Sequence, residues 1–332
     1  MGLLSGAASV TRFNLPVRPQ EIDFEPAAFR AIAPGSEVRE SAGFVPVEPG
    51  ADYQVGAGRW AFRVRVDRLR ADPTTVHERA KQLVAAEMEA TGALFVGPKK
   101  RRQLRNLAEE ELIVQASPRS KIIECAIDGD VLYVASTAKG QLGQVVTLLR
   151  RVGVTAEPKA PWVDRQDADP ETDLVDMREP GESVLGCRFL RGLLGDRLLA
   201  FEPEAGRVVL QTSQARVTLA GEVLPDLLRY AERGAEVLSA KLTTGEVAFR
   251  LDGPSWRLSG LRIDTDRHEH WIGLLDERLE KISAVFDLLD AKYAELDPAR
   301  RPAPVVREAA GGGGGVVSDG GRIVPIRNRN SF

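Results

Sequence analysis

A run of cations stands out among the residues whose side chains could do chemistry. Between Arg59 and Arg105 the chain carries 12 Lys or Arg against 5 Asp or Glu, a local excess of seven positive charges. Five of these cations fall at the predicted start of a helix at Pro98, where the helix dipole favours anions. Cations placed against that preference indicate contact with a phosphate backbone, and the free amides of a helix start add donors. The predicted DNA-binding residues are Arg63, Arg65, Lys99, Lys100, Arg101, Arg102, Arg105 and Arg119.

The same cations have a simpler interpretation, which is a solvated helix face. Glu109, Glu110 and Glu111 follow one or two turns later and would balance the charge. The residues alone leave both interpretations open.

Motifs for catalysis or metal binding are weak. His268 and His270 stand two residues apart and therefore do not share a helix face, which disfavours a metal site. The chain has no P-loop, no Gly-x-Ser-x-Gly and no His-Glu-x-x-His motif. The glycine run 311–315 has no lysine and no following helix, so it is a linker and no phosphate cradle. We therefore expect no catalytic residue, no metal, no cofactor and no enzymatic activity.

Composition bounds the size and the compartment. The 332 residues are 43% hydrophobic, which suffices for a sizeable core in two or three structural units. The net charge of −3 does not favour a DNA binder, but binding follows local patches more than net charge. Cys125 and Cys187 stand in apolar stretches and predict buried thiols in a reducing cytoplasm. No signal-peptide pattern and no run of 18 apolar residues occurs, so a cytoplasmic protein without a membrane partner is expected.

The order of elements predicts an α+β fold with mixed or antiparallel sheets, built from two related strand, helix and hairpin halves. In the N-terminal region 1–156, apolar residues alternate with Arg63 and Arg65, which indicates a half-buried strand with a cationic outward face. Asp72 can cap a helix that begins at Pro73. The pattern predicts a strand over 59–66, helices over 73–90 and 98–115, a hairpin over 122–136 that turns at 128–130, and a helix over 139–151.

The second part of the chain begins after an acidic, Pro-containing linker predicted over 157–182. The region 183–297 is predicted to hold strands over 185–190, 198–202, 207–211 and 256–263, a helix over 224–233, a hairpin over 237–251 and a long helix over 270–296. The Pro-, Gly- and Arg-rich tail 298–332 is predicted to be disordered. The apolar stripe of the last helix is predicted to help form a dimer, the alternative being burial within its own chain: Leu275, Leu279, Ile282, Phe286 and Leu289.

Three stretches resemble the recombination-associated RdgC family. The first runs from Pro98 to Arg151, with Lys-Lys-Arg-Arg-Gln-Leu-Arg at 99–105, Ser-Pro-Arg at 117–119 and Leu-Leu-Arg-Arg at 148–151. The second runs from Arg207 to Ile263, with Val-Thr-Leu at 217–219 and Ala-Lys-Leu-Thr at 240–243. The last helix is the third, and Ser-Ala-Gly-Phe-Val-Pro at 41–46 fits a family-like turn. Order and spacing agree over about two thirds of the chain, while the N-terminus lacks the family's aromatic-rich opening.

The resemblance implies a ring-shaped homodimer that encircles double-stranded DNA with little sequence preference. It also implies modulation of DNA recombination through antagonism of a recombinase. The alternative is an oligomeric protein-interaction module with no nucleic-acid role, and a nuclease ranks behind both because no clustered carboxylate motif occurs. Salt-dependent DNA affinity would separate the first two hypotheses.

Overall fold

The structure is a computed structural model, and it describes residues 2–33, 36, 38–114, 116–170, 179–204 and 206–299. Met1 to Ala299 form one compact unit. Apart from its first two residues, the predicted tail 298–332 lies outside the described residues, as do residues 171–178 of the predicted linker. The rest of that linker contains the short strand β7 (Glu157–Pro158) and the one-turn helix α4 (Pro161–Asp164), whose Trp162 is buried.

An antiparallel sheet runs through the described part of the chain. Its strand order is β10-β9-β11-β12-β13-β1-β6-β5-β4-β2, with β3, β7 and β8 paired beside this path. The prediction of an α+β fold with antiparallel pairing is confirmed. The other strands are β1 (Ala8–Asn14), β2 (Glu40–Val45), β3 (Gln54–Gly56), β4 (Arg59–Leu69), β5 (Pro118–Asp128), β6 (Val131–Val134), β8 (Ala200–Phe201), β9 (Gly206–Gln211), β10 (Arg216–Gly221), β11 (Glu236–Thr243), β12 (Ala248–Asp252) and β13 (Arg257–Leu261).

Strand β1 connects the two predicted regions. It pairs with β6 through Thr11 and Val134, and with β13 through Ala8 and Leu261. The two halves do not repeat one topology. In the first half, β5 pairs with β4, which is the strand before it in the chain. In the second half, β11 pairs with β9 and not with β10, the strand before it in the chain.

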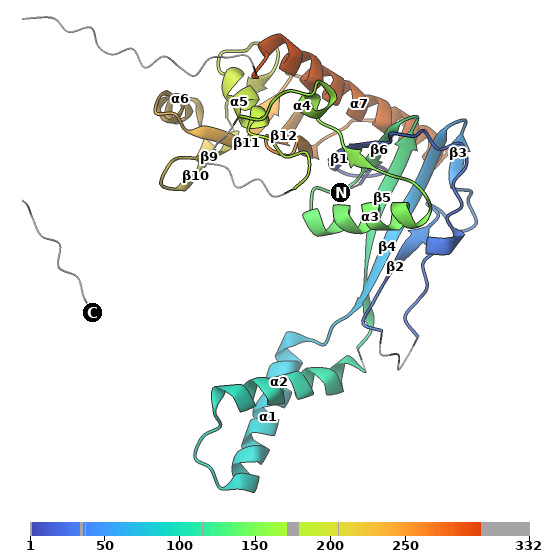
Figure 1. Cartoon of the computed structure of the whole chain (residues 1–332), viewed down its shortest axis with the longest axis vertical. Helices are drawn as coiled ribbons and strands as arrows, with labels where there is room; N and C mark the ends of the chain where they lie inside the picture. Colours follow the sequence, from blue (N-terminus) through green and yellow to red (C-terminus); the bar gives the residue numbers. More distant parts are fainter. Residues whose placement is uncertain are drawn as a thin grey trace, which may run out of the picture. The chain divides into compact units, whose positions relative to one another are not determined.

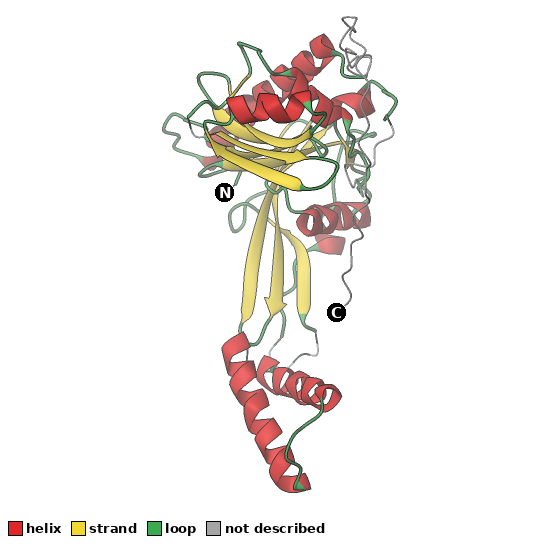
Figure 2. Cartoon of the chain, turned by 90° about the vertical axis from the view of Figure 1, so that its left-hand side faces the viewer, coloured by secondary structure: helices red, strands yellow, loops and turns green. Residues whose placement is uncertain are grey.

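The long strands β4 and β5 lead to a helical hairpin, which Figures 1 and 2 show projecting beyond the ends of these strands. Helix α1 (Pro73–Thr91) begins as predicted, because the Asp72 carboxylate accepts hydrogen bonds from the amides of Thr74 and Thr75 at 3.0 Å each. It ends at Gly92, whose φ of 64° is left-handed. Helix α2 (Pro98–Ile113) packs on α1 and returns the chain to β5.

Two helices cover the sheet with apolar faces. Helix α3 (Lys139–Arg151), at its predicted bounds, buries Leu142, Val145 and Leu149 with aromatic residues of β2 and β4. The second core gathers around helix α7 (Trp271–Leu296), with the short helices α5 (Leu185–Gly192) and α6 (Leu224–Glu232). Both cysteines are buried and free, as predicted.

The apolar stripe of α7 is no dimer interface. All five of its residues are at most 5% exposed within their own chain: Leu275, Leu279, Ile282, Phe286 and Leu289. They share a core with Val10 of β1 and with Trp256. The prediction that this stripe holds two copies together is wrong, because strands distant in sequence already cover it.

Two predicted strands are also wrong or shorter than predicted. Residues 185–190 form α5, where Leu185, Phe189 and Leu190 share one buried face at helical spacing. A six-residue apolar run does not distinguish a buried strand from a helix. Gly186 permits the close approach of α5, because a Cβ there would lie 1.9 Å from the carbonyl oxygen of Gly253. The strand predicted over 198–202 shrinks to the two residues of β8.

Candidate nucleic-acid interface

The start of α2 concentrates positive charge. Five cations follow Pro98 within the first two turns, and all five side chains are exposed; we call this set the collar: Lys99, Lys100, Arg101, Arg102 and Arg105. Successive residues of a helix are about 100° apart, so these side chains surround the helix start and do not line a single face. The collar therefore presents charge in several directions around one helix end.

The amides of the collar add donors. Gly97 is the N-cap and contributes no side-chain hydrogen bond, and Pro98 has no amide hydrogen. The first backbone bond of the helix runs from the Arg101 amide to the Gly97 carbonyl oxygen at 3.0 Å. The amides of Lys99 and Lys100 precede it and stay free of helical acceptors. Two amide donors thus stand among the five cations.

Most of the collar is free of internal neutralisation. Lys100 forms an ion pair with Glu87 of α1 at 3.0 Å, which ties the two helices together. Among the residues that the structure describes, no ion pair engages Lys99, Arg101, Arg102 or Arg105. The balance by Glu109 to Glu111 is partial, since Glu111 pairs with Arg79 at 2.8 Å.

The two predicted arginines of β4 are engaged inside the fold. Arg63 contacts Glu124 at 3.1 Å and donates to the Val47 carbonyl oxygen at 2.6 Å. Arg65 forms two hydrogen bonds to Asp67, at 2.9 and 2.8 Å, which hold the pKa of that carboxyl below its usual value. These arginines therefore neutralise acids of the sheet and are poorly available to a phosphate.

The eighth predicted residue lies on another face. Arg119 pairs in register with Arg68, and alternation along β4 places Arg68 on the sheet face opposite Arg63 and Arg65. Hydrogen bonds from Thr75 and, to a smaller extent, the charge of Arg119 lower the pKa of Asp72. Arg119 thus lies near the start of α1. The structure brings the five α2 cations together. It sets the three sheet arginines apart, because Arg63 and Arg65 are paired with acids and Arg119 lies on another sheet face.

Sequence reasoning missed two apolar residues beside the collar. Leu94 is 94% exposed and Phe95 is 72% exposed in the loop between α1 and α2. Val96 is buried and anchors the loop. The available signal was an apolar tripeptide between Gly92 and Gly97, at a position where a helix connection is normally polar.

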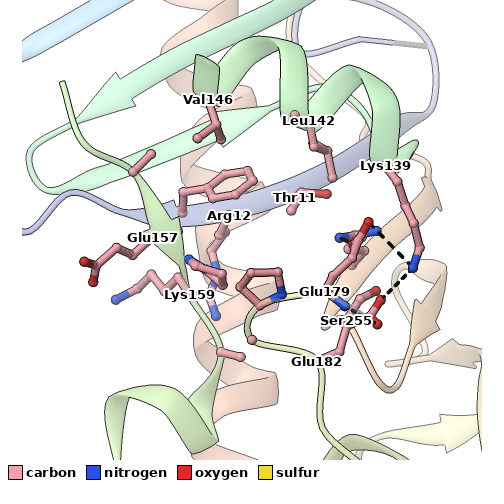
Figure 3. Close-up of a pocket in the computed structure, with 18 of the residues that line it drawn as sticks. Thr11, Arg12, Lys139, Leu142, Val146, Glu157, Lys159, Glu179, Glu182 and Ser255 are labelled. Atoms are coloured by element: carbon pink, nitrogen blue, oxygen red, sulfur yellow. Dashed lines mark hydrogen bonds and ion pairs between the residues drawn. The ribbon is translucent and has the colours of Figure 1, made fainter. Parts of the chain in front are cut away.

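A cavity of about 420 Å³ lies under α3 (Figure 3). It lies beside the edge of β1 that faces away from β6, where the partner of β1 changes from β13 to β7. Leu142 and Val146 form its apolar roof. At one end Lys139 is neutralised by Glu182 at 3.3 Å and by Glu179 at 3.6 Å. A recess of this size between elements of the fold suits a small molecule and does not admit a duplex, so the collar is the better nucleic-acid surface.

Other chemistry is sparse in the described residues. No group of three or more His, Cys, Asp or Glu side chains is arranged there to hold a metal ion. His268 contacts Glu277 at 2.6 Å. Within the same part of the chain, every helix is too short or too polar to cross a membrane.

Comparison with known proteins gives little further guidance. No family model matches the chain. A thymidylate kinase of Nitrosomonas europaea is 31% identical over 132 residues, which is 40% of this chain. The match spans 57% of the length of that kinase.

Proposed function

We propose that this chain binds double-stranded DNA without sequence specificity and that the collar is its main contact. The observation that carries the proposal is the cluster of exposed cations around the start of α2, four of them without an ion pair in the described residues. Point charges and free amides recognise phosphates, which every sequence presents alike. Binding through the DNA backbone predicts little preference between sequences.

We also propose that the chain acts as a ring-shaped homodimer, associated with the nucleoid, that modulates DNA recombination. The resemblance to the RdgC family supports this proposal. The edge strand β10 pairs only with β9 among the described strands, and such an edge suits an interface between two copies. Light scattering should give a mass near twice 36.2 kDa, and a monomer at working concentration would refute the ring.

The similarity to a thymidylate kinase does not lead us to propose a kinase activity. The matched stretch is 40% of the chain, and the sequence has no Gly-x-x-x-x-Gly-Lys-Ser/Thr motif to hold the phosphates of a nucleotide. A non-enzymatic role agrees better with the collar.

The salt dependence of DNA affinity tests the proposed interface. If about six phosphates are neutralised, a plot of log K against log salt should have a slope near −5. Replacing Lys99, Lys100, Arg101 and Arg102 by alanine removes up to four contacts and should bring the slope to about −2. A gel shift on linear and circular duplex at several salt concentrations measures both.

A matched control replaces four exposed arginines that lie outside the hairpin and outside β9 and β10 by alanine: Arg151, Arg197, Arg233 and Arg262. This variant loses the same charge but should keep the slope near −5. Equal losses in both variants would assign binding to net charge and not to the collar. A flat salt response of the wild type would refute electrostatic DNA binding itself.

A further inference from the structure

We propose that Leu94 and Phe95 form an apolar wedge that inserts between base pairs of the duplex held by the collar. The inference rests on the proposed function and extends it to the kind of DNA preferred. That DNA is a duplex whose stacking is interrupted, for example by a bulge or a mismatch.

The loop presents these two side chains to solvent. Leu94 and Phe95 are 94% and 72% exposed, and they are adjacent in the chain. Gly92 at the end of α1 and Gly97 at the start of α2 bound the loop, and the buried Val96 fixes its base. Two neighbouring large apolar residues at a projecting tip are an exposed patch that suits a binding partner.

Charge next to the tip selects the partner. Phe95 precedes Lys99 by four residues, so the chain allows at most about 14 Å between their Cα atoms. Collar cations bound to the phosphates of one DNA strand would therefore keep Phe95 within a few base pairs of those phosphates, where it can reach a base step. Proteins that wedge Phe or Leu between base pairs combine such a residue with nearby cations in this way.

Two other partners fit less well. A membrane-surface helix needs a continuous apolar face along its length, but Leu104 and Ala108 of α2 are already buried in the hairpin. A second copy of the chain would need roughly 800 Å² of surface from each partner, and two side chains supply about half of that at most. A narrow apolar tip that is followed in the chain by exposed cations matches a stacked, anionic polymer better.

The consequence is a preference for interrupted duplexes. Insertion separates a base step, and this separation is less costly where stacking is already broken. We expect the wild type to bind a duplex with a one-nucleotide bulge about tenfold more tightly than the continuous duplex. We also expect the fluorescence of 2-aminopurine beside the bulge to rise on binding, because that base loses a stacking neighbour.

The test compares two variants that both keep the collar. Leu94→Ser with Phe95→Ser removes the wedge, whereas Leu107→Ser with Val114→Ser removes exposed apolar residues elsewhere on the hairpin, 43% and 67% exposed. The first variant should lose the tenfold preference and the fluorescence rise while its salt slope stays near −5. The second should retain all three properties.

Several outcomes would overturn the wedge. An unchanged bulge preference and fluorescence rise in the first variant would show that the tip does not enter the duplex. A change of its mass in light scattering would make the loop an interface between copies. Sedimentation with phosphatidylserine vesicles that depends on Leu94 and Phe95, with DNA signals unaltered, would assign the loop to membranes. Absence of any DNA binding by the wild type would refute the proposed function instead.

Discussion

Truncation of Phe286 to alanine tests whether α7 belongs to the core of its own chain. The ring is 0% exposed, and truncating a fully buried phenylalanine costs about 3–5 kcal/mol. The Arg12 guanidinium lies 4.0 Å from the ring centroid, a contact worth about 1 kcal/mol. Arg12 keeps Asp290, whose oxygens lie at 2.7 and 2.9 Å, so the substitution leaves no unpaired charge. The expected loss of unfolding free energy is therefore about 4–6 kcal/mol.

Urea denaturation followed by circular dichroism measures this loss. A typical domain has about 5–15 kcal/mol of stability, so the transition should move to a much lower urea concentration. Ile272→Ala on the same helix is the control, because Ile272 is 37% exposed and should cost far less. A loss below about 1 kcal/mol together with a halved mass in light scattering would refute the reasoning. It would place Phe286 at an interface between copies.

Two further predictions concern packing and buried charge. Gly43→Ala should destabilise the fold by about 1–3 kcal/mol in urea titrations, because the new Cβ would lie 2.5 Å from the backbone of Phe29. Gly143→Ala, in α3 with open space around its Cβ position, should stabilise by about 0.5–1 kcal/mol, and similar effects at both glycines would contradict the packing argument. Burial raises the pKa of Glu236 above its ordinary value, so the folded state holds the proton more tightly than the unfolded chain. Stability that is present at low pH is therefore lost as the pH rises above the ordinary pKa of a glutamate, and over that rise Glu236→Gln should become more stable relative to the wild type. Parallel stability curves would show that this carboxyl does not titrate on unfolding.

Local signals in the sequence determined the hairpin that carries the candidate interface. A capping aspartate before a proline sets the start of α1, and Gly92 supplies the left-handed residue that ends it. The turn at Asp128-Gly129 and the apolar period of α3 likewise act over a few residues, so both were predicted at nearly their observed bounds. The collar was visible for the same reason, because its five cations are consecutive or one turn apart.

Tertiary structure alone decided which of these features remain available to a partner. The stripe of α7 is periodic in the sequence, but only the fold brings Val10 and Trp256 onto it and buries it. Arg63 looks like a free cation until pairing of β4 with β5 places Glu124 opposite it. Periodicity reports the side of an element on which a residue lies, whereas partners distant in sequence decide what covers that side.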